Sequence, residues 1–286
     1  MAKAVSDLGL PAGSLRAAGV RFSSPLWRFR ARASLVWLGL LVGIILLLAQ
    51  SGLDFPLIRE KLPFLLGFHL TPGGFLQGAA LTIFITACSM VFSVAIGILT
   101  ALGRTSTNAF FFGLATFYAS LFRGTPLLVQ VLMIYLALPQ VGIVLSGLSS
   151  GIIALSLNYG AYLAETIRSG IISVPWGQRE AAMALGLSRL RIGMRIVAPQ
   201  ALRIIIPPAG THFISMLKDS SLVSLMGLWE INFLAQSYGR ATYRYMEMLI
   251  SAAAIYWVMS VILELLQARL ERRYGRGYDR LTSGGA

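Results

Sequence analysis

Ionisable side chains stand inside or at the edges of long apolar runs in this 286-residue chain. Glu165 and Arg168 are three residues apart, so on a helix they share one face and can form an ion pair. The Glu165 carboxylate could instead hold the ammonium or guanidinium group of a ligand. Both interpretations stay open, because ionisable groups at membrane depth are costly and commonly functional.

A second polar cluster, Lys218-Asp219-Ser220-Ser221, follows an apolar stretch. It could form an outer-surface turn in which Asp219 or Ser220 caps the next helix, or it could contact a solute at a gate. Arg123 is expected to anchor its segment at the inner membrane interface. The candidate pathway or gate residues are Arg123, Glu165, Arg168, Lys218, Asp219, Ser220 and Ser221.

No catalytic or metal-binding set accompanies these residues. His69 and His212 are far apart, an H-E-x-x-H motif and a serine nucleophile elbow are missing, and the single Cys88 cannot form an internal disulfide. We therefore expect no catalytic residue, no metal and no directly bound cofactor. The aromatic residues near the expected span ends are interpreted as interfacial belts: Tyr118, Tyr135, Tyr159, Tyr162, Trp176 and Trp229.

The composition is that of a membrane protein. The chain is 56% hydrophobic and 12% charged, with a mean hydropathy of +0.74, whereas soluble domains carry about 25% charged residues. Uncharged runs cover 33–53, 70–103 and 124–164, each long enough for the roughly 20 residues that a spanning helix needs. The predicted fold class is an all-α polytopic helical bundle with about six transmembrane helices.

The net charge of +13 flanks the expected spans, so the positive-inside rule explains it better than a nucleic-acid partner does. Both termini are then cytoplasmic, 107–122 is an interfacial or cytoplasmic-end segment, and 220–229 is a half-penetrating gate segment. The first apolar run is interpreted as a retained anchor. The expected spans are 34–50, 75–102, 124–139, 150–173, 201–217 and 246–267. The expected regions are a basic segment 1–33, an extra helix with an external loop 34–74, the main transmembrane domain 75–270 and a basic tail 271–286.

The loop 174–199 contains a short, soluble-looking helix between spans. Pro175 can precede its first turn, and Gly186 can take the left-handed conformation that ends it. Ala181 and Ala182 are small enough for another surface to approach closely. The alternative is an amphipathic helix whose basic face lies on lipid headgroups.

Several ordered motifs resemble binding-protein-dependent ABC importer permeases of the polar amino acid (histidine, glutamine and arginine) branch. Glu180-Ala181-Ala182, Gly186 and Pro199 resemble the EAA loop, although Ala198 stands where the family usually has leucine. The resemblance covers about 75–270 and leaves the N-terminal 70 residues outside it. The other matching motifs are Phe122–Gln130, Gly160–Glu165 with Arg168 and Gly170, Pro199–Arg203 and Lys218–Leu222.

The resemblance implies the type I importer (MetI-like) fold and a separate motor. The EAA loop would form a coupling helix that docks on a cytoplasmic ABC ATPase dimer, which binds the ATP and Mg²⁺, because this chain has no G-x-x-x-x-G-K-[S/T] phosphate loop. The other implied partners are a second permease subunit, identical or related, a periplasmic solute-binding protein and an amino acid, in a bacterial inner membrane. The ATPase-coupling residues would be Gln178, Glu180, Ala181, Ala182, Gly186 and Pro199.

Three alternatives remain. The cargo could be an opine, a small peptide or another amine-containing solute carried by the same mechanism. An autonomous channel or secondary transporter should show inverted repeats or a buried charge relay, and neither is evident. An intramembrane enzyme would need a catalytic set that the sequence lacks. Glu165, as the one acidic pathway candidate, favours cationic or neutral polar amino acids.

Overall fold

The structure is a computed structural model that describes residues 26–50, 52–68 and 76–274. The regular elements in these residues are helical, apart from one isolated bridge between Gly78 and Glu230. The chain divides into two compact units, Met1–Leu53 and Asp54–Ala286. The first unit holds α3 (Leu26–Gln50), whose segment Ala31–Gln50 is long and apolar enough to cross a membrane.

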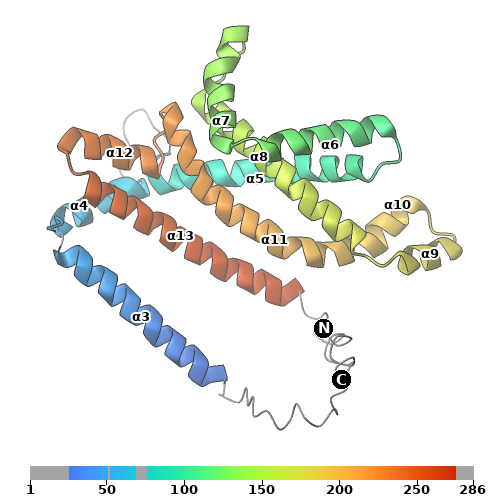
Figure 1. Cartoon of the computed structure of the whole chain (residues 1–286), viewed down its shortest axis with the longest axis horizontal. Coiled ribbons are helices and arrows are strands. Elements are labelled where there is room, and N and C mark those ends of the chain that lie inside the picture. The colour runs from blue at the N-terminus through green and yellow to red at the C-terminus, as the bar shows by residue number, and fades with distance from the viewer. Residues whose placement is uncertain (1–25, 51, 69–75, 275–286) are drawn as a thin grey trace, which may run out of the picture. The chain divides into compact units, whose positions relative to one another are not determined.

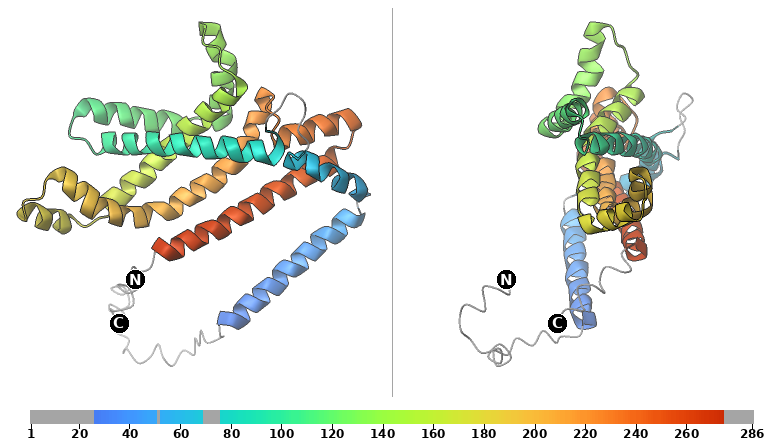
Figure 2. Two further views of the ribbon diagram at one scale, coloured as in Figure 1. Left: turned by 180° about the vertical axis from the view of Figure 1, so that it is seen from behind. Right: turned by 90° about the vertical axis from the view of Figure 1, so that its right-hand side faces the viewer.

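The second unit is built on two long helices, α5 (Gly78–Arg104) and α8 (Gly147–Ile172), which pack side by side (Figures 1 and 2). Small residues line their contact. The Ser93 hydroxyl donates to the Ser156 carbonyl oxygen at 3.3 Å, and a methyl group added at Gly97 would lie 2.9 Å from an α8 side chain. Small residues let helix backbones approach closely, which is a common basis of helix association in membranes.

The next helix, α6 (Ala109–Gly124), turns back along α5. It begins where the Asn108 side chain accepts a hydrogen bond from the Phe110 amide at 2.9 Å, and it packs on both α5 and α8. The expectation that 107–122 is an interfacial segment is therefore wrong, because this helix belongs to the packed bundle. The Arg123 side chain reaches Glu165 on α8 rather than ending at the inner surface.

After α6 the chain bends by 104° (Figure 1). Pro126 lacks an amide hydrogen and disfavours a helical conformation in the residue before it, and Thr125 is accordingly extended. The predicted straight span 124–139 is therefore a bent continuation that projects away from the axis of α5. It consists of α7 (Leu127–Leu132), a π-helix (Met133–Ala137) and a 3-10 helix (Leu138–Val141).

Two elements together run along α8 after the polar loop. α11 (Ala198–Asp219) ends beside Tyr159, in the middle of α8, and the 3-10 helix η4 (Ser220–Met226) continues to the start of α8, where Gly147 and Gly151 leave room for it. The segment predicted as a half-penetrating gate is this 3-10 helix. Lys218 and Asp219 consequently lie at mid-height in the bundle, so the expectation of an outer-surface turn is wrong.

The unit has two ends. The cap end holds α4 (Phe55–Leu66) and α12 (Ile231–Thr242), which pack with α13 (Tyr245–Tyr274) around Leu65, Ile231 and Met248. The hairpin end holds α9 (Trp176–Ala184) and α10 (Arg189–Ile192), which lie beyond the C-terminal ends of α5 and α8 (Figures 1 and 2).

A buried carboxylate helps to organise the cap end. Glu230 is fully buried and accepts hydrogen bonds from the backbone amides of Asn232 and Phe233 and from the Tyr256 hydroxyl. Burial raises the pKa of Glu230 from 4.5 to about 7. This side chain therefore caps the N-terminus of α12.

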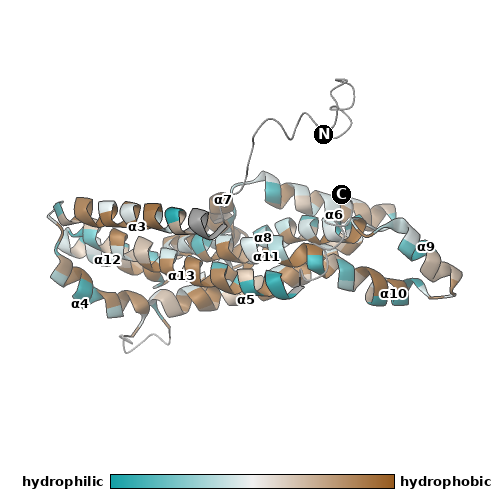
Figure 3. Cartoon of the chain, turned by 90° about the horizontal axis from the view of Figure 1, so that it is seen from below, coloured by the Kyte–Doolittle hydropathy of each residue, from teal (hydrophilic) through white to brown (hydrophobic). Residues whose placement is uncertain are grey.

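Three helices in the described residues pass a length and hydropathy test for membrane spans, in α3, α5 and α13, and the bent pair α6–α7 makes a fourth. The ribbons of α5 and α13 are mostly hydrophobic, whereas α9 and α10 mix hydrophilic and hydrophobic residues (Figure 3). Both α8 and α11 fall outside that test because they carry the polar residues described below. The long helices α8 (26 residues) and α11 (22 residues) complete six candidates for the predicted membrane helices.

Candidate functional site

The loop predicted to be cytoplasmic forms a compact hairpin, defined here as α9 and α10 with the turn between them. Gly186 has φ = +75°, the left-handed conformation that favours glycine. Its amide donates to the Met183 carbonyl at 2.9 Å, and the Leu187 amide donates to the Ala182 carbonyl at 3.1 Å. These bonds end α9 where the sequence predicted a stop.

The hairpin has a small core of its own. Ala182 is 3% exposed and packs with Val174, Ile192 and Val197, so it is not available for close approach by another protein. Glu180 and Ala181 are exposed on the opposite side. The expectation of close approach is therefore wrong for Ala182, which packs inside the hairpin, and stays a prediction for the exposed Ala181.

Two further predicted coupling residues connect α9 to α11. The Gln200 side-chain amide donates to the Gln178 side-chain oxygen, and Gln178 is exposed. Pro199 occupies the first turn of α11, and its ring is exposed. The Gln178–Gln200 hydrogen bond thus joins the hairpin to α11.

Several large apolar side chains on the hairpin are exposed, because no other part of the described bundle covers them. Leu185 is 81% exposed and Leu190 is 72% exposed, and Trp176 and Met183 are exposed as well. An apolar patch of this kind, flanked by charged residues, is typical of a protein-binding surface.

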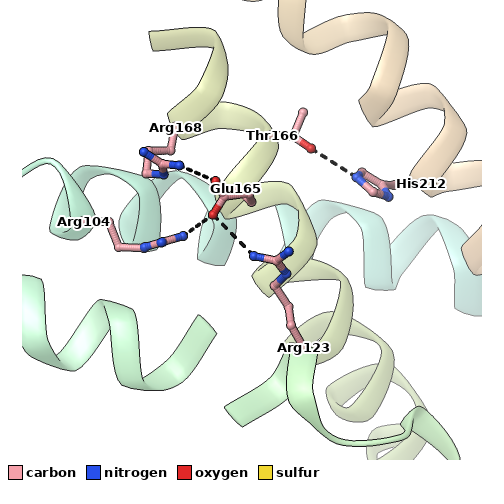
Figure 4. Close-up of polar contacts among 6 residues, drawn as sticks. All are labelled: Arg104, Arg123, Glu165, Thr166, Arg168 and His212. Carbon is pink, nitrogen blue, oxygen red and sulfur yellow. Dashed lines mark hydrogen bonds and ion pairs between the residues drawn. The ribbon is translucent and has the colours of Figure 1, made fainter. Parts of the chain in front are cut away.

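Glu165 lies at the centre of an ion cluster that joins three helices (Figure 4). Arg104 of α5 and Arg168 of α8 each donate to its carboxylate, and the guanidinium of Arg123, in the last turn of α6, lies 3.4 Å from it. The predicted Glu165–Arg168 pair is present. Its other partners, Arg104 and Arg123, come from distant parts of the sequence.

Three guanidinium groups against one carboxylate leave two positive charges in excess in this cluster. Both carboxylate oxygens of Glu165 are already bonded within the protein. The structure therefore gives no support to a free carboxylate awaiting a cationic ligand, and it removes the reason for favouring cationic cargo.

A cavity of about 510 Å³ lies beside this cluster, and we call it the central cavity. Asp219 accepts a hydrogen bond from the Tyr159 hydroxyl at 2.6 Å, and Thr166 Oγ1 lies 3.1 Å from His212 Nε2. The residues that line the central cavity are Arg123, Gly124, Thr125, Pro126, Leu127, Asn158, Tyr159, Tyr162, His212, Ser215 and Asp219.

The sequence alone predicts other roles for several residues that line the central cavity. Tyr159 is 4% exposed and Tyr162 faces the cavity, so both are wrongly interpreted as interfacial aromatics. His212 contacts both tyrosine rings. The spacing of Asn158, Tyr159 and Tyr162 could have revealed them, because positions three or four apart share one helical face.

Three of the predicted gate residues, Lys218, Ser220 and Ser221, do not line the central cavity. The Ser220 hydroxyl is buried and donates to the Leu217 carbonyl, and the Ser221 carbonyl accepts from the Ser224 hydroxyl. Lys218 faces a different cavity, between α11 and α13. In the part of the chain that the structure describes, no three His, Cys, Asp or Glu residues come together as metal ligands; His69 lies outside it.

A profile of the family described as the binding-protein-dependent transport system inner membrane component matches residues 93–276, nearly two thirds of the chain. The chain belongs to this permease family. The match spans the bent α6–α7 segment, the EAA hairpin and the central cavity. Family members are transport subunits rather than enzymes, and they work with a separate ATPase and a binding protein.

Named relatives and solved structures agree with this family assignment. The arginine transport system permease ArtQ of Bacillus subtilis is 36% identical over 223 residues, covering 78% of this permease and 97% of ArtQ. The L-cystine permease TcyB of the same organism is 40% identical over 200 residues, covering 70% and 86%.

The crystal structure of an amino acid ABC transporter with histidines matches with a TM-score of 0.70 at 35% identity, covering 78% of this permease and all of that chain. The inward-facing MetNI methionine transporter, at 20% identity and a TM-score of 0.57, covers 68% of this permease and 91% of its own chain, and shares the fold alone.

Proposed function

We propose that this permease imports polar amino acids across a bacterial inner membrane, using ATP hydrolysed with Mg²⁺ on a partner ATPase dimer. The named relatives transport arginine, cystine and glutamine. The central cavity, with charged, hydroxylic and aromatic residues around it, is the proposed passage for the solute. The protein would pair with a second permease, identical or related, and receive its solute from a periplasmic binding protein.

The observation that carries this proposal is the free-standing hairpin with exposed Leu185 and Leu190. We infer that Gln178, Glu180, Ala181 and Gly186 dock this hairpin on the ATPase, while Ala182 and Pro199 support it. We propose from the positive-inside rule that the hairpin and both termini are cytoplasmic.

Uptake in proteoliposomes tests the proposal. Vesicles that contain this permease with its ATPase and binding protein should accumulate labelled arginine, glutamine or cystine only when ATP is supplied. Glu180→Lys should abolish uptake while the protein still inserts, because the exposed carboxylate is replaced by a cation at the docking surface. Arg240→Gln, on exposed α12 at the cap end, is the matched control. ATP-independent uptake by this chain alone would refute the proposal.

A further inference from the structure

A second cavity, of about 350 Å³, lies between α11 and α13, and we call it the α11–α13 groove. Its lining positions recur every three or four residues on both helices, so each helix presents one face to it. Most of the lining side chains are polar or charged. They are Thr211, Ile214, Ser215 and Lys218 of α11, and Glu264, Gln267, Ala268 and Glu271 of α13.

The groove contains charges that the protein does not neutralise. Within the described residues, neither Lys218 nor Glu264 has an ion-pair partner within 4.0 Å, and both are exposed. Lys218 precedes Asp219, which is bonded to Tyr159 in the middle of α8. A lysine at mid-bilayer costs on the order of 3 kcal/mol on insertion scales. These groups therefore require water or a charged partner in the groove rather than lipid.

The side chain of Gln267 holds α13 against α11 at the groove. The Gln267 side-chain amide donates to the Pro207 carbonyl at 2.9 Å and to the Glu271 carboxylate at 2.8 Å. Gly210 makes room for it, since a methyl group there would lie 2.7 Å from Gln267 Cδ. Gln267 thus closes the contact between the helices and leaves Lys218 and Glu264 free.

We propose that the α11–α13 groove is a second solute site, where Lys218 binds the carboxylate of an amino acid and Glu264 its ammonium group. A zwitterion supplies both opposite charges, which a purely cationic or anionic solute does not. The volume is at the small end of the roughly 300–1,000 Å³ typical of ligand sites, which favours a single amino acid over a peptide. Ser215 lines both cavities, so the groove adjoins the proposed passage.

This inference rests on the proposed function, and binding measurements separate the two. The probe is whichever of labelled arginine, glutamine and cystine the wild-type assembly transports best, measured in nanodiscs without the binding protein. Lys218→Gln should raise its Kd at least tenfold yet leave the Kd of the decarboxylated amine unchanged. Glu264→Gln should do the same for the amino acid while sparing the deaminated acid. Arg269→Gln, exposed on α13 outside the groove, should change none of these values.

A thiol in the groove gives a measurement that does not depend on losing a charge. In a Cys88→Ala background, Ala268→Cys should react with a water-soluble methanethiosulfonate reagent, and saturating amino acid should slow the reaction at least fivefold. If ATP-driven uptake is normal but saturating amino acid does not slow the reaction at Ala268→Cys, the groove proposal is overturned. The proposed function is then unaffected. Weaker uptake in Lys218→Gln and Glu264→Gln with all binding constants unchanged also overturns it, and instead indicates contact with a second permease subunit. A wild-type assembly that takes up no probe overturns the proposed function and this inference with it.

Discussion

The turn at Gly186 offers a test of how much the hairpin depends on one backbone conformation. Gly186 has φ = +75°, and a methyl group added there would meet no atom within 4 Å. The cost of Gly186→Ala is therefore conformational rather than steric, and a residue other than glycine in the left-handed region costs roughly 1–2 kcal/mol. Gly177, on the same helix, also has open space around it but no positive φ. Gly177→Ala should be neutral or stabilising by up to about 1 kcal/mol.

Hydrogen exchange at the Leu187 amide measures this difference directly, because that amide is bonded to the Ala182 carbonyl across the turn. A loss of 1–2 kcal/mol corresponds to roughly 5–30-fold faster exchange. Gly186→Ala should show this acceleration together with weaker retention of the ATPase during purification. Gly177→Ala should show neither change.

Equal exchange rates for wild type and Gly186→Ala would refute the assigned role of the glycine. Faster exchange with undiminished ATPase retention and uptake would separate the two claims. It would mean that the turn is built as described but that the ATPase binds elsewhere.

Substitutions in the bundle and at its cap end test packing and charge. Glu165→Gln leaves three guanidinium groups close together, so thermal scans of the detergent-purified protein should show a loss of about 1–3 kcal/mol, allowing for partial exposure; an unchanged melting temperature would contradict the cluster. Gly97→Ala should cost about 1–3 kcal/mol by overpacking, whereas Gly113→Ala, with open space around it, should cost nothing measurable. Burial raises the pKa of Glu230 from 4.5 to about 7, so the native state holds this proton more tightly than the unfolded chain does. The contribution of Glu230 to stability is therefore full below pH 4.5 and is lost as the pH rises through 7, so the melting temperature of Glu230→Gln should fall less over pH 4.5–7 than that of the wild type.

The sequence allowed the long elements to be placed because their limits are local. The predicted span 150–173 is the helix Gly147–Ile172, and 201–217 is Ala198–Asp219. Apolar runs, a glycine stop and flanking charges all act within a few residues of the feature they define. The stop at Gly186 was predictable for the same reason.

The errors concern groups whose partners are distant in the sequence. Arg123 is predicted at the membrane surface because an isolated arginine is costly in lipid, but its side chain lies 3.4 Å from Glu165, 42 positions away. Tyr159 and Tyr162 were interpreted as interfacial because aromatics favour interfaces, yet their helix turns that face toward α11. Which face of a spanning helix meets protein rather than lipid is decided by packing that no single segment encodes.

The long helices α8 and α11 both fail the hydropathy test, and both contribute residues to the central cavity. Tyr159 and Thr166 of α8 bond to Asp219 and His212 of α11, so the polar residues that lower their hydropathy face each other. A lipid-facing helix could not keep these groups, since each unsatisfied polar group in hydrocarbon costs several kcal/mol. In α8 and α11 the groups are retained because neighbouring helices and the cavity satisfy them.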